Sequence, residues 1–264
     1  MKISLGGYSF NQLFLEGKMD VFGYLETVKY RYRLDAVDLW NAQIAERTTP
    51  ILTLADESYL RKVREALDEK ELRLINLAVD TAHLWDPDPE MREALYQSAL
   101  NHLKAAVILG AETVRIDTGG YGEQEFSEEA FHWIVTKYRE YCRICSDYGI
   151  KIGPENHMGP SLIPKQLARI AQAVDEPNFG ILVHLNRWDQ DREDGNEIVA
   201  PWVIHTHFDA NTAGSEEAPD IVRMLRRYGY EGHYSIEYNA QSNPYIEIEH
   251  VIAQVKKRLA EADN

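Results

Sequence analysis

The chain has 264 residues, of which 44% are hydrophobic, and its 43 acidic and 28 basic side chains give a formal net charge of −15. This length suits one large domain, and we expect neither a membrane-spanning segment nor a secretory leader. The negative charge disfavours binding to nucleic acid phosphates and to anionic membranes. We therefore expect a cytoplasmic protein that binds small molecules, and neither nucleic acid nor a membrane.

Eight strand-like apolar segments alternate with helical patterns along the chain. The predicted strands cover residues 3–8, 36–40, 72–79, 113–118, 151–155, 180–184, 203–207 and 234–237. The predicted helices cover residues 56–70, 89–109, 128–148, 165–173, 218–228 and 245–260. Three of these helices are followed or ended by a glycine that can adopt a left-handed conformation, namely Gly110, Gly149 and Gly229. The pattern predicts an α/β fold, a single (β/α)8 TIM barrel over residues 1–264.

Four of the later predicted strands end in a residue that can bind a metal ion. These residues are Glu155, His184, His207 and Glu237, and their separations of 29, 23 and 30 residues match a repeating strand-and-helix unit. Because the carboxyl ends of barrel strands meet at one mouth, four successive strands can direct one ligand each toward one point. The sequence therefore indicates a metalloenzyme built on a barrel.

Other polar and aromatic residues near the strand ends are candidates for substrate binding. Arg115, His157 and His83 can donate hydrogen bonds to substrate oxygens, and Trp40 and Trp188 can pack against one face of a substrate, although packing alone also explains such aromatic residues. His205 lies two residues before His207 and is expected on the same face of the strand, as a second ligand or as support for the first. The pair Cys142 and Cys145 falls within a helical pattern, which favours two free thiols over a redox or zinc site.

The order of these ligands resembles that of the xylose isomerase-like barrels. The resemblance lies in the residues at four successive strand ends. Glu155 ends one strand and His184 ends the next, His207 lies in an H-x-H-x-x-D segment, and Glu237 lies in a final S-I-E. It spans nearly the whole chain and implies that these four residues hold one divalent ion. It also implies that Glu155 and Glu237 act as the paired acid and base of catalysis.

One position departs from the family pattern, since His184 stands where the family usually has Asp. A neutral imidazole still coordinates Zn, Mn, Fe or Co, and the resemblance also implies Mg, so the identity of the ion is left open among these five metals. The alternative is that the metal site has been lost and that a barrel without enzymatic activity remains.

The resemblance implies a divalent-metal-dependent isomerase or epimerase acting on a sugar or keto sugar by proton transfer through a metal-stabilised enediolate. The runner-up is a lyase or dehydratase that removes a β-substituent from a 3-keto sugar, keto-glycoside or inosose. An apurinic endonuclease is disfavoured because the chain is acidic and lacks further ligand motifs. No phosphate-binding motif is evident, so the expected substrate is an unphosphorylated sugar or polyol. Homo-oligomerisation remains possible.

Overall fold

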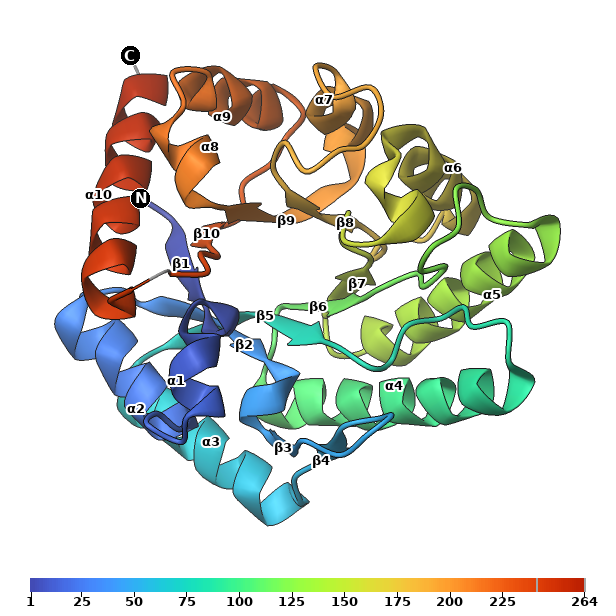
Figure 1. Cartoon of the computed structure of the whole chain (residues 1–264), viewed down its shortest axis with the longest axis horizontal. Coiled ribbons are helices and arrows are strands. Elements are labelled where there is room, and N and C mark those ends of the chain that lie inside the picture. Colours follow the sequence, from blue (N-terminus) through green and yellow to red (C-terminus); the bar gives the residue numbers. More distant parts are fainter. Residues whose placement is uncertain (241, 264) are drawn as a thin grey trace.

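The eight predicted strands form one parallel sheet. The protein is represented by a computed structural model that describes residues 1–240 and 242–263. The strands follow the order β7-β6-β5-β2-β1-β10-β9-β8. Their bounds are Ile3–Gly6 for β1, Ala36–Trp40 for β2, Arg73–Val79 for β5, Thr113–Ile116 for β6, Lys151–Gly153 for β7, Ile181–His184 for β8, Val203–Phe208 for β9 and Tyr234–Ile236 for β10. Helices surround these strands, and the result is a nearly closed (β/α)8 TIM barrel, as predicted (Figure 1).

The barrel is joined between β7 and β8 by isolated bridges rather than by a continuous ladder. Ile152 is bridged to Phe179, and Glu155 is bridged to Leu182. Gly153 allows this approach, because a Cβ atom at that position would lie only 1.6 Å from the carbonyl oxygen of Gly180. A short β7 with no side chain at its end therefore brings the chain at Glu155 beside β8.

All six predicted helices are present, with small shifts at their ends. They are α3 (Glu57–Glu69), α4 (Pro89–Leu109), α5 (Glu128–Ser146), α6 (Pro164–Val174), α9 (Ala218–Arg227) and α10 (Pro244–Ala262). Asp56, Asp88 and Ser127 cap the first turns of α3, α4 and α5 by accepting hydrogen bonds from backbone N–H groups. The glycines predicted to end helices have positive φ angles of 69° at Gly110, 68° at Gly149 and 86° at Gly229.

Shorter elements, which the sequence patterns did not predict, lie in the connections. The α-helices among them are α1 (Asn11–Leu15), α2 (Val21–Glu26), α7 (Gly195–Val199) and α8 (Ala210–Gly214), and β3 (Ala45–Glu46) and β4 (Thr53–Leu54) form a small antiparallel pair. The 3-10 segments are Gly7–Phe10, Asn41–Gln43, Gly159–Leu162 and Ala200–Trp202, and Thr27–Arg31 is a π-helical turn. Such elements are shorter than the window in which hydrophobic periodicity can be recognised.

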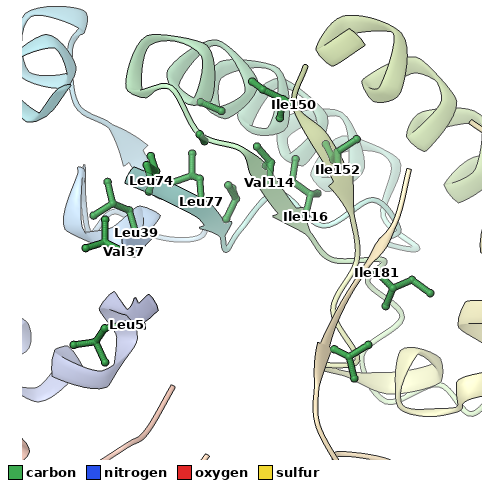
Figure 2. Close-up of a cluster of buried hydrophobic side chains, with 14 of the residues drawn as sticks. Leu5, Val37, Leu39, Leu74, Leu77, Val114, Ile116, Ile150, Ile152 and Ile181 are labelled. Atoms are coloured by element: carbon green, nitrogen blue, oxygen red, sulfur yellow. The ribbon is translucent and has the colours of Figure 1, made fainter. Parts of the chain in front are cut away.

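The hydrophobic core includes a layer between the barrel and its helices. In β2, the buried residues Val37 and Leu39 flank Asp38, and the alternation of a strand places their side chains on the opposite face from the carboxylate. Val37 pairs with Leu74 of β5, and Leu39 pairs with Leu77 (Figure 2). Polar side chains such as Asp38 are thereby directed toward the inside of the barrel.

The two cysteines of α5 belong to this core. Both thiols are free, and burial raises the pKa of Cys142 to about 12 and that of Cys145 to about 11. These pKa values make both groups poor sources of thiolate at neutral pH.

Within residues 1–240 and 242–263, the helices lack the length and apolar character needed to cross a membrane.

Candidate metal centre

Four strands place the predicted ligands at one mouth of the barrel. His184 is the last residue of β8 and His207 lies near the end of β9, whereas Glu155 and Glu237 follow the ends of β7 and β10. One ligand atom from each side chain lies within 4.8 Å of the ligand atoms of the other three. Glu155 is only 1% exposed and the side chain of Glu237 is 16% exposed, so the cluster is largely shielded from water.

The separations between neighbouring ligand atoms match those required around one small ion. Glu155 Oε1 lies 3.5 Å from His184 Nδ1 and 3.4 Å from His207 Nδ1. The carboxylate of Glu237 lies 3.4 Å from His207 Nδ1 and 3.8 Å from His184 Nδ1. Two ligand atoms about 2.1 Å from a tetrahedral ion lie roughly 3.4 Å from each other. The nearest pairs thus already have the spacing that a shared ion imposes.

Hydrogen bonding and charge also fit a cation at this position. His184 Nδ1 is buried without a hydrogen-bond partner, although it faces two carboxylates. A donor set of two imidazole nitrogens and two carboxylate oxygens suits Zn, Mn, Fe or Co. The residues therefore fit a divalent transition-metal ion.

The pKa values of two ligands reflect the concentration of charge. Burial opposes ionisation of Glu155, but the charge of His207 and the close approach of His184 and His207 to the carboxylate hold the pKa of Glu155 well below the usual range. Burial acts to lower the pKa of His207, but the carboxylates of Glu237 and Glu155 and the contact with Asp38 raise it to about 10. The site therefore stabilises a positive charge, and an ion bound through His207 Nδ1 would displace a proton.

Carboxylates lie behind both imidazoles. His207 Nε2 is 3.4 Å from Asp38 Oδ2, and the same oxygen is 2.6 Å from His205 Nε2. His205 thus takes the supporting position, one of the two predicted for it, rather than joining the four-ligand cluster. His184 Nε2 lies 3.8 Å from Asp209 Oδ2. Such partners orient a metal-binding imidazole and keep its coordinating nitrogen free of a proton.

Asn156 connects two of the ligands through the backbone, a role that the sequence did not indicate. Its side-chain oxygen accepts a hydrogen bond from His184 N at 2.7 Å, and its amide nitrogen donates to the carbonyl oxygens of His184 at 2.9 Å and of Arg187 at 2.8 Å. Asn156 is fully buried and directly follows Glu155. It therefore fixes the end of β8 relative to the end of β7.

Arg187 is a second residue whose role sequence reasoning missed. Its Nη1 lies 3.3 Å from Glu155 Oε1, and its Nη2 lies 3.3 Å from His184 Nε2 and 3.8 Å from Glu237 Oε1. The sequence signal was available, because an arginine three residues after a strand-end ligand can return to the barrel mouth. The guanidinium is in contact with three of the four candidate ligands.

A cavity of about 130 Å³ opens beside the ligand cluster, and its walls include three of the five predicted substrate-binding residues, Trp40, Arg115 and His157. Glu155, His207 and Glu237 also line it. The ring of Trp40 meets that of Tyr8 edge to face at 5.1 Å, and its indole nitrogen donates to Asp80 at 2.6 Å. These two rings form an aromatic wall next to the ligands.

Arg115 and His157 belong to one charged network in this cavity. Arg115 donates to Asp80 at 2.8 Å and to Asp117 at 2.9 Å, and its Nε lies 3.4 Å from Glu155 Oε2. His157 Nδ1 lies 2.8 Å from Asp117 Oδ2. The charge of Asp117 outweighs burial and raises the pKa of His157 to about 9. Both residues can donate hydrogen bonds to a ligand.

The structure places the other two predicted substrate-binding residues outside the cavity lining. Trp188 follows β8 and is buried, and its indole N–H donates to Asn196 of α7 at 2.9 Å, within the connection between β8 and β9. His83 lies in the connection after β5, with Nε2 3.9 Å from Asp86. Trp188 packs within its own connection, so it does not present an open ring face to a sugar in the cavity.

Comparison with solved structures shows the same fold over the whole chain. The 3-keto-D-glucoside 4-epimerase YcjR from E. coli has a TM-score of 0.75 and 13% identity over 97% of this chain and 99% of that one. A D-psicose 3-epimerase from Clostridium cellulolyticum H10 has a TM-score of 0.74 and 12% identity over 100% and 98% of the two chains. The probable 3-DHS dehydratase AsbF from Bacillus anthracis has a TM-score of 0.70 and 15% identity over 98% and 99%.

Sequence comparison is informative at the level of the family. No curated protein sequence matches the chain. The profile of the xylose isomerase-like TIM barrel matches residues 34–261, which includes all four candidate ligands. The chain therefore belongs to the xylose isomerase-like TIM barrel family.

Proposed function

We propose that this protein is a divalent-metal-dependent isomerase or epimerase that acts on a sugar or keto sugar by proton transfer. The observation that carries the proposal is the convergence of two carboxylates and two imidazoles at the barrel mouth, with neighbouring ligand atoms 3.4–3.8 Å apart. Epimerases of the same fold support this class of chemistry. The aromatic wall of Trp40 and Tyr8 supports an unphosphorylated sugar or polyol as the substrate.

The two glutamates have environments that suit different parts of a proton transfer. A divalent ion held by Glu155, His184, His207 and Glu237 would supply polarisation of a substrate carbonyl, which acidifies the neighbouring C–H group. Glu237 is the more exposed carboxylate and lines the cavity, so we assign it the removal of that proton. Glu155, which Arg115 contacts, would take up a proton from solvent and return it to the substrate carbon from another direction, while Glu237 passes the proton that it removed to solvent. Return to the opposite face of the same carbon gives an epimer, and return to the neighbouring carbon gives an isomer.

The remaining cavity residues would hold the substrate during this transfer. Arg115 and His157 can donate hydrogen bonds to hydroxyl or carbonyl oxygens, and Trp40 can support one face of the sugar. We expect these contacts to orient the reacting C–H group toward Glu237.

Exchange of substrate hydrogen with D₂O tests the proposal. Purified protein loaded with Mn²⁺ should incorporate deuterium into a keto sugar, and Glu237→Gln should reduce that rate by roughly 10²–10⁴-fold, the usual contribution of a general base. Glu231→Gln, at an exposed position before β10, should leave the rate unchanged. Incorporation by Glu237→Gln at the parental rate would remove Glu237 from the mechanism.

The alternative is a lyase or dehydratase acting on a 3-keto sugar, keto-glycoside or inosose. It is favoured by one observation, the presence of a probable 3-DHS dehydratase among the structures of like fold. The same carboxylates would remove the proton, but a β-substituent would then leave. Mass spectrometry separates the two reactions, because a deuterated isomer identifies the first and a released leaving group identifies the second.

A further inference from the structure

Arg187 contacts both of the carboxylates that a metal ion would bind. Its guanidinium lies 3.3 Å from Glu155 Oε1, the oxygen that also faces both imidazoles, and 3.8 Å from Glu237 Oε1. A guanidinium and a divalent ion are both cations that seek these two carboxylates. Because both carboxylates are shared, occupancy by one cation weakens the binding of the other.

The contact between Arg187 and His184 opposes ion binding for a second reason. A guanidinium can only donate, so Arg187 Nη2 at 3.3 Å makes His184 Nε2 the acceptor and places the ring proton on Nδ1 in the neutral imidazole. Nδ1 is the nitrogen that faces Glu155 and Glu237. An ion can bind there only if the proton moves to Nε2, where it would face Arg187. Asp209, 3.8 Å from Nε2, is the acceptor that this second tautomer would use.

The backbone at Arg187 is fixed, so relief must come from its side chain. The carbonyl oxygen of Arg187 accepts a 2.8 Å hydrogen bond from the buried amide of Asn156. The side chain is 34% exposed, which leaves a path toward solvent. Rotation of the side chain can therefore free both carboxylates and His184 Nε2 without movement of β8.

We propose that Arg187 is a built-in competitor of the metal ion, and that ion binding displaces its guanidinium from Glu155, Glu237 and His184 and switches His184 to the tautomer that hydrogen-bonds Asp209. Arg187 would thereby set the affinity of the site for divalent ions. The inference shares with the proposed function only the position of the ion between the four ligands. It concerns the binding of the ion in the absence of substrate.

Titration of the full-length protein with Mn²⁺ and with Zn²⁺ by calorimetry tests this inference. Arg187→Met retains the apolar part of the side chain and removes the charge, and it should lower the dissociation constant roughly tenfold, equivalent to about 1.4 kcal/mol. Arg187→Lys keeps the positive charge and should therefore bind the ion more weakly than Arg187→Met does. Arg192→Met, at an exposed arginine in the same connection, is the matched control and should bind as the parent does. Thermal unfolding of each variant verifies folding, and Arg187→Gln replaces Arg187→Met if the latter does not fold.

The possible outcomes distinguish this inference from the proposed function. Equal or weaker binding by Arg187→Met would overturn the competition while leaving an ion-dependent enzyme in place. Binding by Arg187→Met but not by the parent would support the competition and would contradict ion dependence of the natural protein. Absence of binding in both would overturn both proposals.

Discussion

Two buried histidines illustrate how partners rather than burial set the protonation of a side chain. His102 and His207 are each 1% exposed. His102 Nδ1 donates to the carbonyl oxygen of Ser98 at 2.8 Å, and Asn41 Nδ2 donates to His102 Nε2 at 3.1 Å, so both ring nitrogens are satisfied in the neutral form. Burial lowers the pKa of His102, whereas the carboxylates around His207 overcome burial and raise its pKa to about 10.

The neutral state of His102 predicts a specific pH dependence of stability. Because its pKa is lower in the folded protein than in the unfolded chain, the unfolded chain binds more protons below pH 6.5, and stability is lost as the pH falls through that range. Between pH 7 and pH 5, the parent should lose up to about 2 kcal/mol more free energy of unfolding than His102→Gln, which has no titrating group at this site. Urea titrations at both pH values measure the difference. Equal losses in the two proteins would show that His102 does not titrate on unfolding.

At the level of elements, the junction between β7 and β8 holds two candidate ligands in register. Glu155 follows β7 and is bridged to Leu182 of β8, while His184 ends β8. Two features make the junction possible, namely the absence of a side chain at Gly153 and the three hydrogen bonds of Asn156. The geometry of the metal centre therefore depends on the closest approach of two strands.

Gly153→Ala tests this dependence. The new Cβ would lie 1.6 Å from the carbonyl oxygen of Gly180, so the two strands must separate, and we expect a loss of about 3 kcal/mol or more in the free energy of unfolding. Gly214→Ala is the control, because its added Cβ meets nothing within 4 Å, and it should stay within about 0.5 kcal/mol of the parent. Equilibrium denaturation provides both values. A Gly153→Ala protein as stable as the control would show that the junction can widen freely.

For the molecule as a whole, the four ligands lie at or just after the carboxyl ends of four different strands, β7, β8, β9 and β10. An ion that binds them links distant parts of the chain and binds only when the barrel is assembled. Ion binding should therefore stabilise the native state by mass action.

This linkage predicts a shift in the thermal unfolding temperature. At an ion concentration one hundred times the dissociation constant, stabilisation of about 2.7 kcal/mol should raise the Tm by roughly 5 °C. His184→Ala should lose the shift together with the bound metal measured by mass spectrometry, whereas His132→Ala, at an exposed position on α5, should retain both. A full shift in His184→Ala would place the ion elsewhere.

Patterns within single segments determined the fold. All eight strands and six long helices were predictable, because buried strands and amphipathic helices differ in hydrophobic period and because Gly110, Gly149 and Gly229 mark helix ends. The short elements in the connections were not predictable, since a helix or strand of two to six residues is set by the contacts around it.

The sequence by itself also determined which four residues could meet at the barrel mouth, because parallel strands share one carboxyl end and the candidates recur at strand ends. Only the tertiary structure decided what surrounds them. It placed Arg187 against Glu155 and Glu237, joined Asn156 to His184, and buried Trp188 within its own connection. These contacts depend on how each connection folds back over the barrel. The local sequence does not encode that path, because side-chain packing between segments distant in the chain determines it.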